Sequence, residues 1–274
     1  MYQPISIIGK LFKLYLLFPS HPSKIRIESI IGKLCFPYGI KIKNEDGVVF
    51  KLDPNDWITR TILEQGYYER ASIELGKKIL QTGAVFVDIG ANFGLFSCSL
   101  GKCNSGLKII SVEPNYQVIP RLVNNIKLNN LNQQVQVVNA AVSDQIQFVF
   151  LELAEKNNLG TTGTSFTDNG GIAVLSCAMD YILKTNYISE VDLIKIDIEG
   201  NEFTVLENFP FEKYLIRNIL LEFNFLSKIT LSDLKIFFNS KEFDLFTVNG
   251  ERITCDTIDI PENNIWVSNR QQTQ

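Results

Sequence analysis

An acid followed by a glycine-containing turn is the segment of this 274-residue chain with the clearest chemistry. The apolar residues 85–87 lead into Asp88, and the turn continues with the spacing Asp88-x-Gly90-x-Asn92-x-Gly94. Glycine allows positive φ and lets the backbone approach a ligand closely, and asparagine tolerates the left-handed region best among the other residues. An apolar strand that ends in this way and opens a helix is typical of a nucleotide-binding βαβ unit.

A second acid, Glu113, follows the apolar segment 107–112 and stands where such a unit holds the ribose hydroxyls. A dinucleotide-binding turn needs the pattern G-x-G-x-x-G, whereas Asn92 and Leu95 occupy its second and third glycine positions. The turn is therefore not built to cradle a pyrophosphate, and Asp88 supplies a counter-charge for a cationic ligand. An ordinary strand-to-helix turn would explain the glycines, but it would not explain why an acid stands at the end of both strands. These features favour S-adenosylmethionine over NAD.

Helices and strands alternate along the chain, which is the pattern of a doubly wound α/β fold. We predict strands at 85–88, 107–112, 135–139, 145–153, 172–176, 192–196 and 216–222, and closing strands around Leu245 and Trp266. The predicted helices are at 57–64, 68–80, 94–103, 116–130, 201–208 and 231–239. The expected architecture is a Rossmann-like, mostly parallel sheet of seven strands with helices on both faces.

Residues 1–55 are expected to form an N-terminal extension of a helix and a strand pair, and residues 56–274 the main domain. The segment 5–18 is apolar but carries Lys10 and Lys13, and it is too short and too charged to span a membrane. We favour an amphipathic helix that packs on the body of the protein. A peripheral contact of residues 5–18 with an anionic membrane is the weaker alternative.

The composition is that of a soluble globular protein, with 45% apolar and 20% charged residues. A formal net charge of −4 argues against nucleic acid as a partner, although residues 1–51 hold eight Lys and Arg against three Asp and Glu. The five cysteines include no C-x-x-C pair, so neither a zinc site nor a disulfide framework is expected. A reducing compartment suits such a chain, and we expect a cytoplasmic protein.

Acidic residues also follow the other predicted strands. Ligands of open α/β sheets bind beyond the carboxyl ends of the strands, where the sequence places Asp144, Asp197, Glu199 and Glu222. An acid near a helix N-terminus also complements the helix dipole, and this structural role is a serious alternative for Glu199. It explains Asp197 less well, because Asp197 closes a strand of otherwise apolar character.

Several sequence blocks resemble the signature of the FkbM family of methyltransferases. The longest are Asp88–Gly94, Val112–Asn115 and Asp192–Glu202, and the shorter ones are Tyr68-Glu69, Ala140–Asp144 and Met179–Ile182. The resemblance keeps the right order over residues 60–225, and the block Lys-Ile-Asp-Ile-Glu-Gly at 195–200 is its most discriminating part. Asn201 departs from the alanine that the family most often has, and the first fifty residues lie outside the resemblance.

The resemblance implies a class I methyltransferase fold that transfers a methyl group from S-adenosylmethionine, usually to a hydroxyl of a sugar, glycan or small natural product. It also implies which residues bind the cofactor: Asp88, Gly90 and Gly94 at the methionine end with Asn92 between them, Glu69 at the amino-acid end, Glu113 at the ribose, and Ala141 with Asp144 at the adenine. Asp197 and Glu199 would lie near the methyl group.

A hydroxyl acceptor loses its proton during methyl transfer, and a positioned base assists that step. The only histidine, His21, lies in the N-terminal segment, so Asp197 or Glu199 is the expected base, with Glu222 behind them. Acids at strand ends also serve as cofactor partners or helix caps, and an acid pair can hold a divalent metal ion. The sequence leaves these roles open, and we assign no metal ligand.

Residues 157–171 are rich in Gly, Thr, Asn and Ser and contain no predicted helix or strand. Long irregular segments inside compact domains are uncommon and usually functional. We therefore predict a lid or an acceptor-recognition loop there, and a plain surface connection is the alternative.

Two functions other than catalysis of methyl transfer are alternatives for this chain. A non-catalytic scaffold that binds S-adenosylmethionine remains the alternative, although such a relative would be expected to lose some of the acids and glycines that are intact here. An NAD-dependent oxidoreductase would need the dinucleotide glycine spacing and a Tyr-x-x-x-Lys pair, and the sequence offers neither. The motifs therefore favour a methyltransferase.

Overall fold

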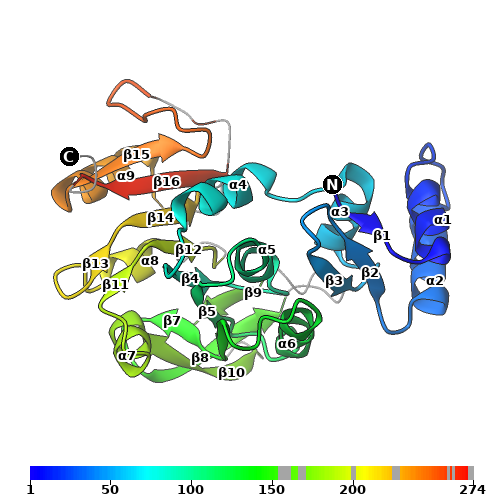
Figure 1. Cartoon of the computed structure of the whole chain (residues 1–274), viewed down its shortest axis with the longest axis horizontal. Helices are drawn as coiled ribbons and strands as arrows, with labels where there is room; N and C mark the ends of the chain where they lie inside the picture. Colours follow the sequence, from blue (N-terminus) through cyan, green and yellow to red (C-terminus); the bar gives the residue numbers. More distant parts are fainter. Residues whose placement is uncertain are drawn as a thin grey trace.

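A seven-stranded sheet forms the centre of the computed structural model, which describes residues 1–153, 162–165, 171–198, 202–223, 229–257, 260 and 263–270 (Figure 1). Its strands, in spatial order, are β15 (Phe243–Thr247), β16 (Asn264–Asn269), β14 (Asn218–Glu222), β12 (Leu193–Ile196), β4 (Val85–Ile89), β5 (Lys108–Val112) and β6 (Val135–Val138). The strands from β14 to β6 pair in parallel, and β16 runs antiparallel to both of its neighbours. The predicted α/β, mostly parallel fold is confirmed.

Helices cover both faces of this sheet because successive strand residues point to opposite sides. Phe86 packs into the core with α4 (Arg70–Ile79), α5 (Leu95–Cys103) and α6 (Ile119–Leu128). Its neighbour Val87 packs into the second core with α7 (Met179–Thr185), α8 (Glu202–Glu207) and α9 (Leu231–Ser240). The sheet is buried on both faces, and only its strand ends are open to ligands.

The N-terminal extension contains one helix more than the sequence predicts. It consists of β1 (Gln3–Pro4), α1 (Ile7–Leu16), α2 (Lys24–Cys35), β2 (Ile40–Lys43) and β3 (Val49–Leu52), and α3 (Trp57–Gln65) follows. In Figure 1 the pair α1 and α2 forms one end of the long axis of the molecule. None of the described helices is both long enough and apolar enough to cross a bilayer.

The three-stranded sheet of the extension packs directly against the nucleotide-binding half of the main domain. The Phe50 ring contacts the Phe93 ring edge-on at a centroid distance of 5.5 Å. Asn125 of α6 accepts a hydrogen bond from the Lys51 backbone at 2.9 Å, and Asn129 accepts one from Val49 at 2.8 Å. The core is therefore continuous across residue 55, and the division into two units at that residue stays a prediction.

A second sheet lies beside the central one, formed by β7 (Ala141–Ser143), β10 (Ile172–Ala178), β8 (Gln147–Leu153) and β9 (Thr162–Ser165), with a short pair β11 (Glu190–Val191) and β13 (Leu215–Ile216) elsewhere. The middle of the segment predicted as a lid forms β9, which pairs antiparallel with β8. The rest of that segment, 157–161 and 166–170, lies outside the described residues, so the lid itself stays a prediction.

Candidate active site

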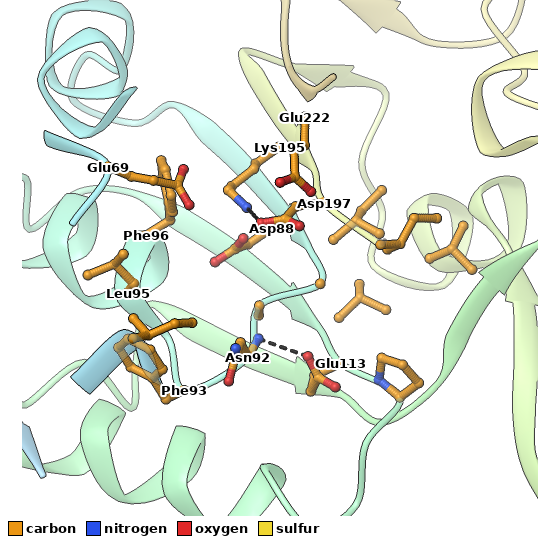
Figure 2. A pocket seen from close by; sticks show the side chains of 18 of the residues that line it. Glu69, Asp88, Asn92, Phe93, Leu95, Phe96, Glu113, Lys195, Asp197 and Glu222 are labelled. Atoms are coloured by element: carbon orange, nitrogen blue, oxygen red, sulfur yellow. Dashed lines mark hydrogen bonds and ion pairs between the residues drawn. The ribbon is translucent and has the colours of Figure 1, made fainter. Parts of the chain in front are cut away.

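A pocket opens at the carboxyl ends of β4, β5, β12 and β14, where the chain order of the strands changes direction (Figure 2). This is the position at which open α/β sheets bind their ligands. Residues 88–93, Glu113 and residues 140–142 line it, together with Tyr68, Glu69 and Asp197. Most of the sequence-predicted site residues thus meet in one cavity.

The glycine turn is held by close contacts between neighbouring elements. Gly90, Asn92 and Gly94 all have positive φ, at +79°, +49° and +89°, as expected for such a turn. A Cβ on Gly90 would lie 1.8 Å from the Asp197 carbonyl oxygen, and one on Gly94 would lie 2.7 Å from the Leu122 side chain. Gly90 lines the pocket, but Gly94 is not among the described residues that do; its glycine serves the packing of α5 on α6.

Asp88 is buried, with 1% of its surface exposed. One of its two carboxylate oxygens accepts hydrogen bonds from the helix that follows. Its Oδ2 accepts hydrogen bonds from the Ser97 backbone at 3.1 Å and from the Ser97 hydroxyl at 2.5 Å, in the first turn of α5. Ser111 of β5 shares the Ser97 hydroxyl at 2.7 Å. Burial raises the pKa of Asp88. Asp88 therefore lines the pocket and also ties β4 to α5.

Glu113 fixes the turn with both of its carboxylate oxygens. Oε2 accepts from the Asn92 backbone N–H and Oε1 from the Asn115 backbone N–H, each at 2.8 Å. Burial raises the pKa of Glu113 to about 7, against the two hydrogen bonds that lower it. Each oxygen retains a lone pair for a further donor. The side chain can therefore accept ribose hydroxyls without releasing the turn, and the ribose contact itself stays a prediction.

Lys195 is the only basic side chain among the described residues that line the pocket, and the sequence prediction did not single it out. It is 3% exposed, its Nζ lies 2.5 Å from Asp197 Oδ2, and it sits 4.7 Å above the Phe96 ring. Burial alone would lower the pKa of Lys195, but the surrounding carboxylates raise it above its ordinary value. The sequence does contain a signal for Lys195, since it lies within an otherwise apolar strand. A lysine that is buried there needs charged partners, which indicates nearby acids.

The carboxylates of Asp88, Asp197 and Glu222 gather about Lys195, and Glu113 stands apart beside Asn92 (Figure 2). Burial would raise the pKa of Asp197, but the charge of Lys195 and a hydrogen bond from Glu222 bring it below its ordinary value. Glu199 lies outside the described residues, and its role stays a prediction.

Glu69 approaches the pocket from the loop before α4. Its backbone has φ +48°, and its half-buried carboxylate accepts a hydrogen bond from the Asn264 side chain at 3.3 Å. Burial raises the pKa of Glu69 to about 7, with Lys195 opposing and Asp197 reinforcing the shift. Glu69 is thus a pocket acid that changes its charge near neutral pH.

The adenine end departs in part from the prediction. Ala141 lines the pocket together with Ala140 and Val142, but Asp144 is exposed and is not among the lining residues. The reason is that β7 leaves the central sheet to pair with β10, which carries the residues after Ser143 past the pocket. A contact of Asp144 with the adenine therefore stays a prediction without support from this geometry.

The strand order, the antiparallel β16 and the pocket at the change of direction define the class I, Rossmann-like fold of methyltransferases. Residues 88–244 match the model of the methyltransferase FkbM domain, and the chain belongs to this family. S-adenosylmethionine is the cofactor, and the acids of the pocket fit its cationic methionine end and its ribose.

Methyltransferase sdnD of Sordaria araneosa is 24% identical to this chain over 174 residues, which cover 52% of the chain and 67% of that protein. Among solved structures, the human methyltransferase 10 domain containing protein is 11% identical, with a TM-score of 0.49 over 91% of this chain and 97% of that one. TYW2 of M. jannaschii in complex with AdoMet is 16% identical, with a TM-score of 0.41 over 83% and 82%. The family assignment rests on the domain match and not on these distant likenesses.

Proposed function

We propose that this chain transfers the methyl group of S-adenosylmethionine to a hydroxyl oxygen of a small molecule, with sugars, glycans and natural products as the acceptor class. The observation that carries the proposal is Glu69, a pocket carboxylate whose pKa burial raises to about 7. A general base works best when its pKa lies near the working pH. A hydroxyl acceptor needs such a base, because its proton leaves during the transfer.

The remaining pocket residues have roles that follow from their charge. S-adenosylmethionine supplies a methyl group that is already activated by a sulfonium, so the protein mainly orients the acceptor and excludes water. We assign the ribose to Glu113 and the methionine end to Asp88 and the turn at Gly90. The carboxylates outnumber Lys195 in the described pocket, which leaves a surplus of negative charge suited to a cationic ligand.

We assign different tasks to Asp197 and Glu69. Asp197 is 25% exposed, and Lys195 keeps it ionised, so it is a weak base that can hold an acceptor hydroxyl by accepting a hydrogen bond. Glu69 would accept the hydroxyl proton as the carbon–oxygen bond forms and the methyl–sulfur bond breaks, which leaves the cofactor as a neutral thioether. Glu199 keeps its predicted place near the methyl group as the second candidate base.

The test is a transfer assay with S-adenosylmethionine labelled in its methyl group and a panel of sugar, glycan and natural-product alcohols. The expected product is a methyl ether, and the Glu69→Gln variant should still bind the cofactor, although more weakly because a negative charge is lost, but it should lose turnover and the pH dependence of turnover. A product methylated on nitrogen or carbon would contradict the proposal. Cofactor binding without transfer to any acceptor would favour the non-catalytic scaffold.

We also propose that the protein works in a reducing compartment such as the cytoplasm. Its five cysteines are free thiols, and Cys35, Cys103 and Cys255 are exposed. Exposed thiols persist where glutathione and thioredoxin keep them reduced. Fractionation of cells that produce the chain tests this proposal, and recovery of the protein from an oxidising compartment would contradict it.

A further inference from the structure

The outer face of α1 carries a continuous apolar stripe. Ile7, Leu11 and Leu14 recur at helical spacing on this face, Phe18 follows just beyond the end of the helix, and each is more than half exposed, from 58% to 77%. The opposite face of the same helix, with Gly9, Phe12 and Leu16, is buried against the body. An amphipathic helix normally turns its apolar face inward, whereas α1 is apolar on both faces.

The neighbouring helix α2 repeats this arrangement. Ile27, Ile30 and Leu34 recur at helical spacing and are exposed, and Ile25 near the start of the helix is 74% exposed. Its inward face buries Glu28 and Gly32. Single exposed apolar residues are normal on a protein surface, but two adjacent helices that both expose a row of them form a patch that usually marks an interaction site.

The two helices are held firmly in this orientation. Lys24 of α2 donates hydrogen bonds to the carbonyls of Leu16 and Phe18 at 2.7 Å and so closes the C-terminal end of α1. Arg60 of α3 pairs with Glu28 of α2 at 3.2 Å. The apolar stripes are therefore part of a fixed surface of the fold, which we call the α1–α2 face.

All exposed charges of α1 and α2 are positive. Lys10, Arg26 and Lys33 are exposed, and the single acid of the two helices is the buried, paired Glu28. A second copy docked symmetrically on this face would bring like charges together, because both partners of such an interface present the same patch. A partner with an apolar layer beneath a negatively charged surface matches both properties.

We propose that the α1–α2 face docks on the surface of a membrane that contains anionic lipid. The two helices would lie in the plane of the interface, with their apolar stripes among the acyl chains and their Lys and Arg side chains at the headgroups. Each basic residue close to such a surface adds attraction that fades within a Debye length. The proposal does not depend on the proposed acceptor.

The position of the face in the molecule suits this contact. The helices α1 and α2 form one end of the long axis, with the bulk of the main domain at the other end (Figure 1). α1 packs on α3, whose first residues Trp57 and Ile58 line the pocket. A docked molecule would therefore keep the main domain clear of the bilayer, with α3 linking the membrane contact to the wall of the pocket.

The experiment is flotation of the full chain with vesicles of phosphatidylcholine alone and of equal parts phosphatidylcholine and phosphatidylglycerol. The chain should float with the anionic vesicles, and raising the salt should weaken this binding. Leu11→Glu combined with Leu14→Glu should weaken it by about tenfold or more, because two apolar side chains no longer enter the acyl layer. Ile236→Glu changes an equally exposed apolar residue of α9 and is the matched control.

Circular dichroism and cofactor binding show whether each variant is folded, since the substituted residues are exposed and do not line the pocket. Absence of wild-type flotation with anionic vesicles would overturn the proposal, as would equal flotation of the stripe variant and the Ile236→Glu control. Light scattering measures whether the chain forms a dimer. A dimer that the stripe substitutions dissociate would assign the α1–α2 face to a second copy and would also overturn the proposal.

Discussion

The pocket and the α1–α2 face depart from the usual distribution of residues in opposite directions. In the pocket, charged groups are buried: Asp88, Lys195 and Glu113 are 1%, 3% and 5% exposed. At the α1–α2 face, large apolar residues such as Ile7 and Leu34 are exposed, at 77% and 76%. Burying charges and exposing apolar residues both cost free energy in an isolated chain, since charged groups prefer water and apolar groups avoid it. The buried acids of the pocket suit the cationic cofactor, and we propose that the exposed apolar residues of the α1–α2 face suit a membrane.

The two regions also differ in how tightly their residues depend on one another. Lys195 pairs with Asp197 and Asp88 is tied to Ser97, so the removal of one partner leaves the other uncompensated in the interior. The exposed apolar residues of α1 and α2 contact solvent, so the removal of one changes little in the fold. Substitutions of the same kind should thus have large effects in the pocket and small effects at the α1–α2 face.

Gly90→Ala should have the largest effect. A Cβ at this position meets the Asp197 carbonyl oxygen at 1.8 Å, and backbone cannot move aside as a flexible side chain can. We expect a loss of more than about 4 kcal/mol in the free energy of unfolding, measured by urea denaturation. Gly83→Ala is the control, because Gly83 has a similar φ of +86° with nothing within 4 Å, and strain alone costs about 1–2 kcal/mol. Equal losses in the two variants would show that φ and not the contact matters.

Lys195→Met should be nearly as damaging. The substitution keeps an unbranched side chain only one heavy atom shorter but leaves Asp197, Asp88 and Glu69 without their buried counter-charge. We expect a loss of about 3–5 kcal/mol near neutral pH that becomes smaller as acid protonates these carboxylates. Lys33→Met on the exposed side of α2 is the matched control and should change stability by less than about 0.5 kcal/mol. If Lys195→Met lost as little stability as Lys33→Met, the expected difference between the pocket and the α1–α2 face would be wrong.

The sequence predicts the regular part of the fold well because hydrophobic periodicity sets it locally. The strand predicted at 85–88 is Val85–Ile89 in the structure, and the helix predicted at 231–239 is Leu231–Ser240. The helix α2 was missed because charged and apolar residues alternate from Lys24 to Glu28, which is the pattern of a strand. The structure adds a tertiary contact of Glu28 with Arg60, which joins α2 to α3 and which spacing within the segment does not show.

The candidate site was predictable at the level of strand ends but not at the level of contacts. Asp88, Glu113 and Asp197 were identified because acids after apolar strands stand out in the sequence. Lys195 and Ser97 are not identified as partners of Asp88, since Lys195 lies on β12 and Ser97 on α5, whereas Asp88 lies on β4. Such pairings depend on how β4, β12 and α5 pack, and spacing along the chain does not encode that directly.

The pH dependence of the pocket gives a third, smaller effect. Burial raises the pKa of Glu113 from 4.5 to about 7, so the folded state binds this proton more tightly than the unfolded state does. Its contribution to stability is complete below the unfolded pKa and is lost as the pH rises through about 7. The melting temperature of the cofactor-free protein should therefore fall over this range. Glu113→Gln should flatten the profile, and an unchanged profile would contradict the assignment.

Cofactor affinity should change in the opposite direction over the same pH range. Ribose hydroxyls donate to the ionised form of Glu113, and the cationic methionine end favours the ionised form of Glu69, whose pKa burial also raises to about 7. Calorimetric affinity for S-adenosylmethionine should fall by up to about tenfold for each pH unit below 7 that protonates one of these groups. Release of protons on binding at neutral pH would support the same linkage, and pH-independent binding would contradict it.

Leu14→Glu should have the smallest effect on stability and is the sharpest test of the α1–α2 face. Leu14 is 58% exposed and its helix is anchored by the opposite face, so the free energy of unfolding should change by less than about 0.5 kcal/mol. Phe12→Ala on the buried face of the same helix should cost about 3–5 kcal/mol. If Leu14→Glu approached that loss in urea denaturation, the stripe would be packed within the monomer and would be unavailable to a membrane. If Leu14→Glu left the free energy of unfolding unchanged but prevented the variant from floating with anionic vesicles, the exposed stripe would serve the membrane contact and not the fold.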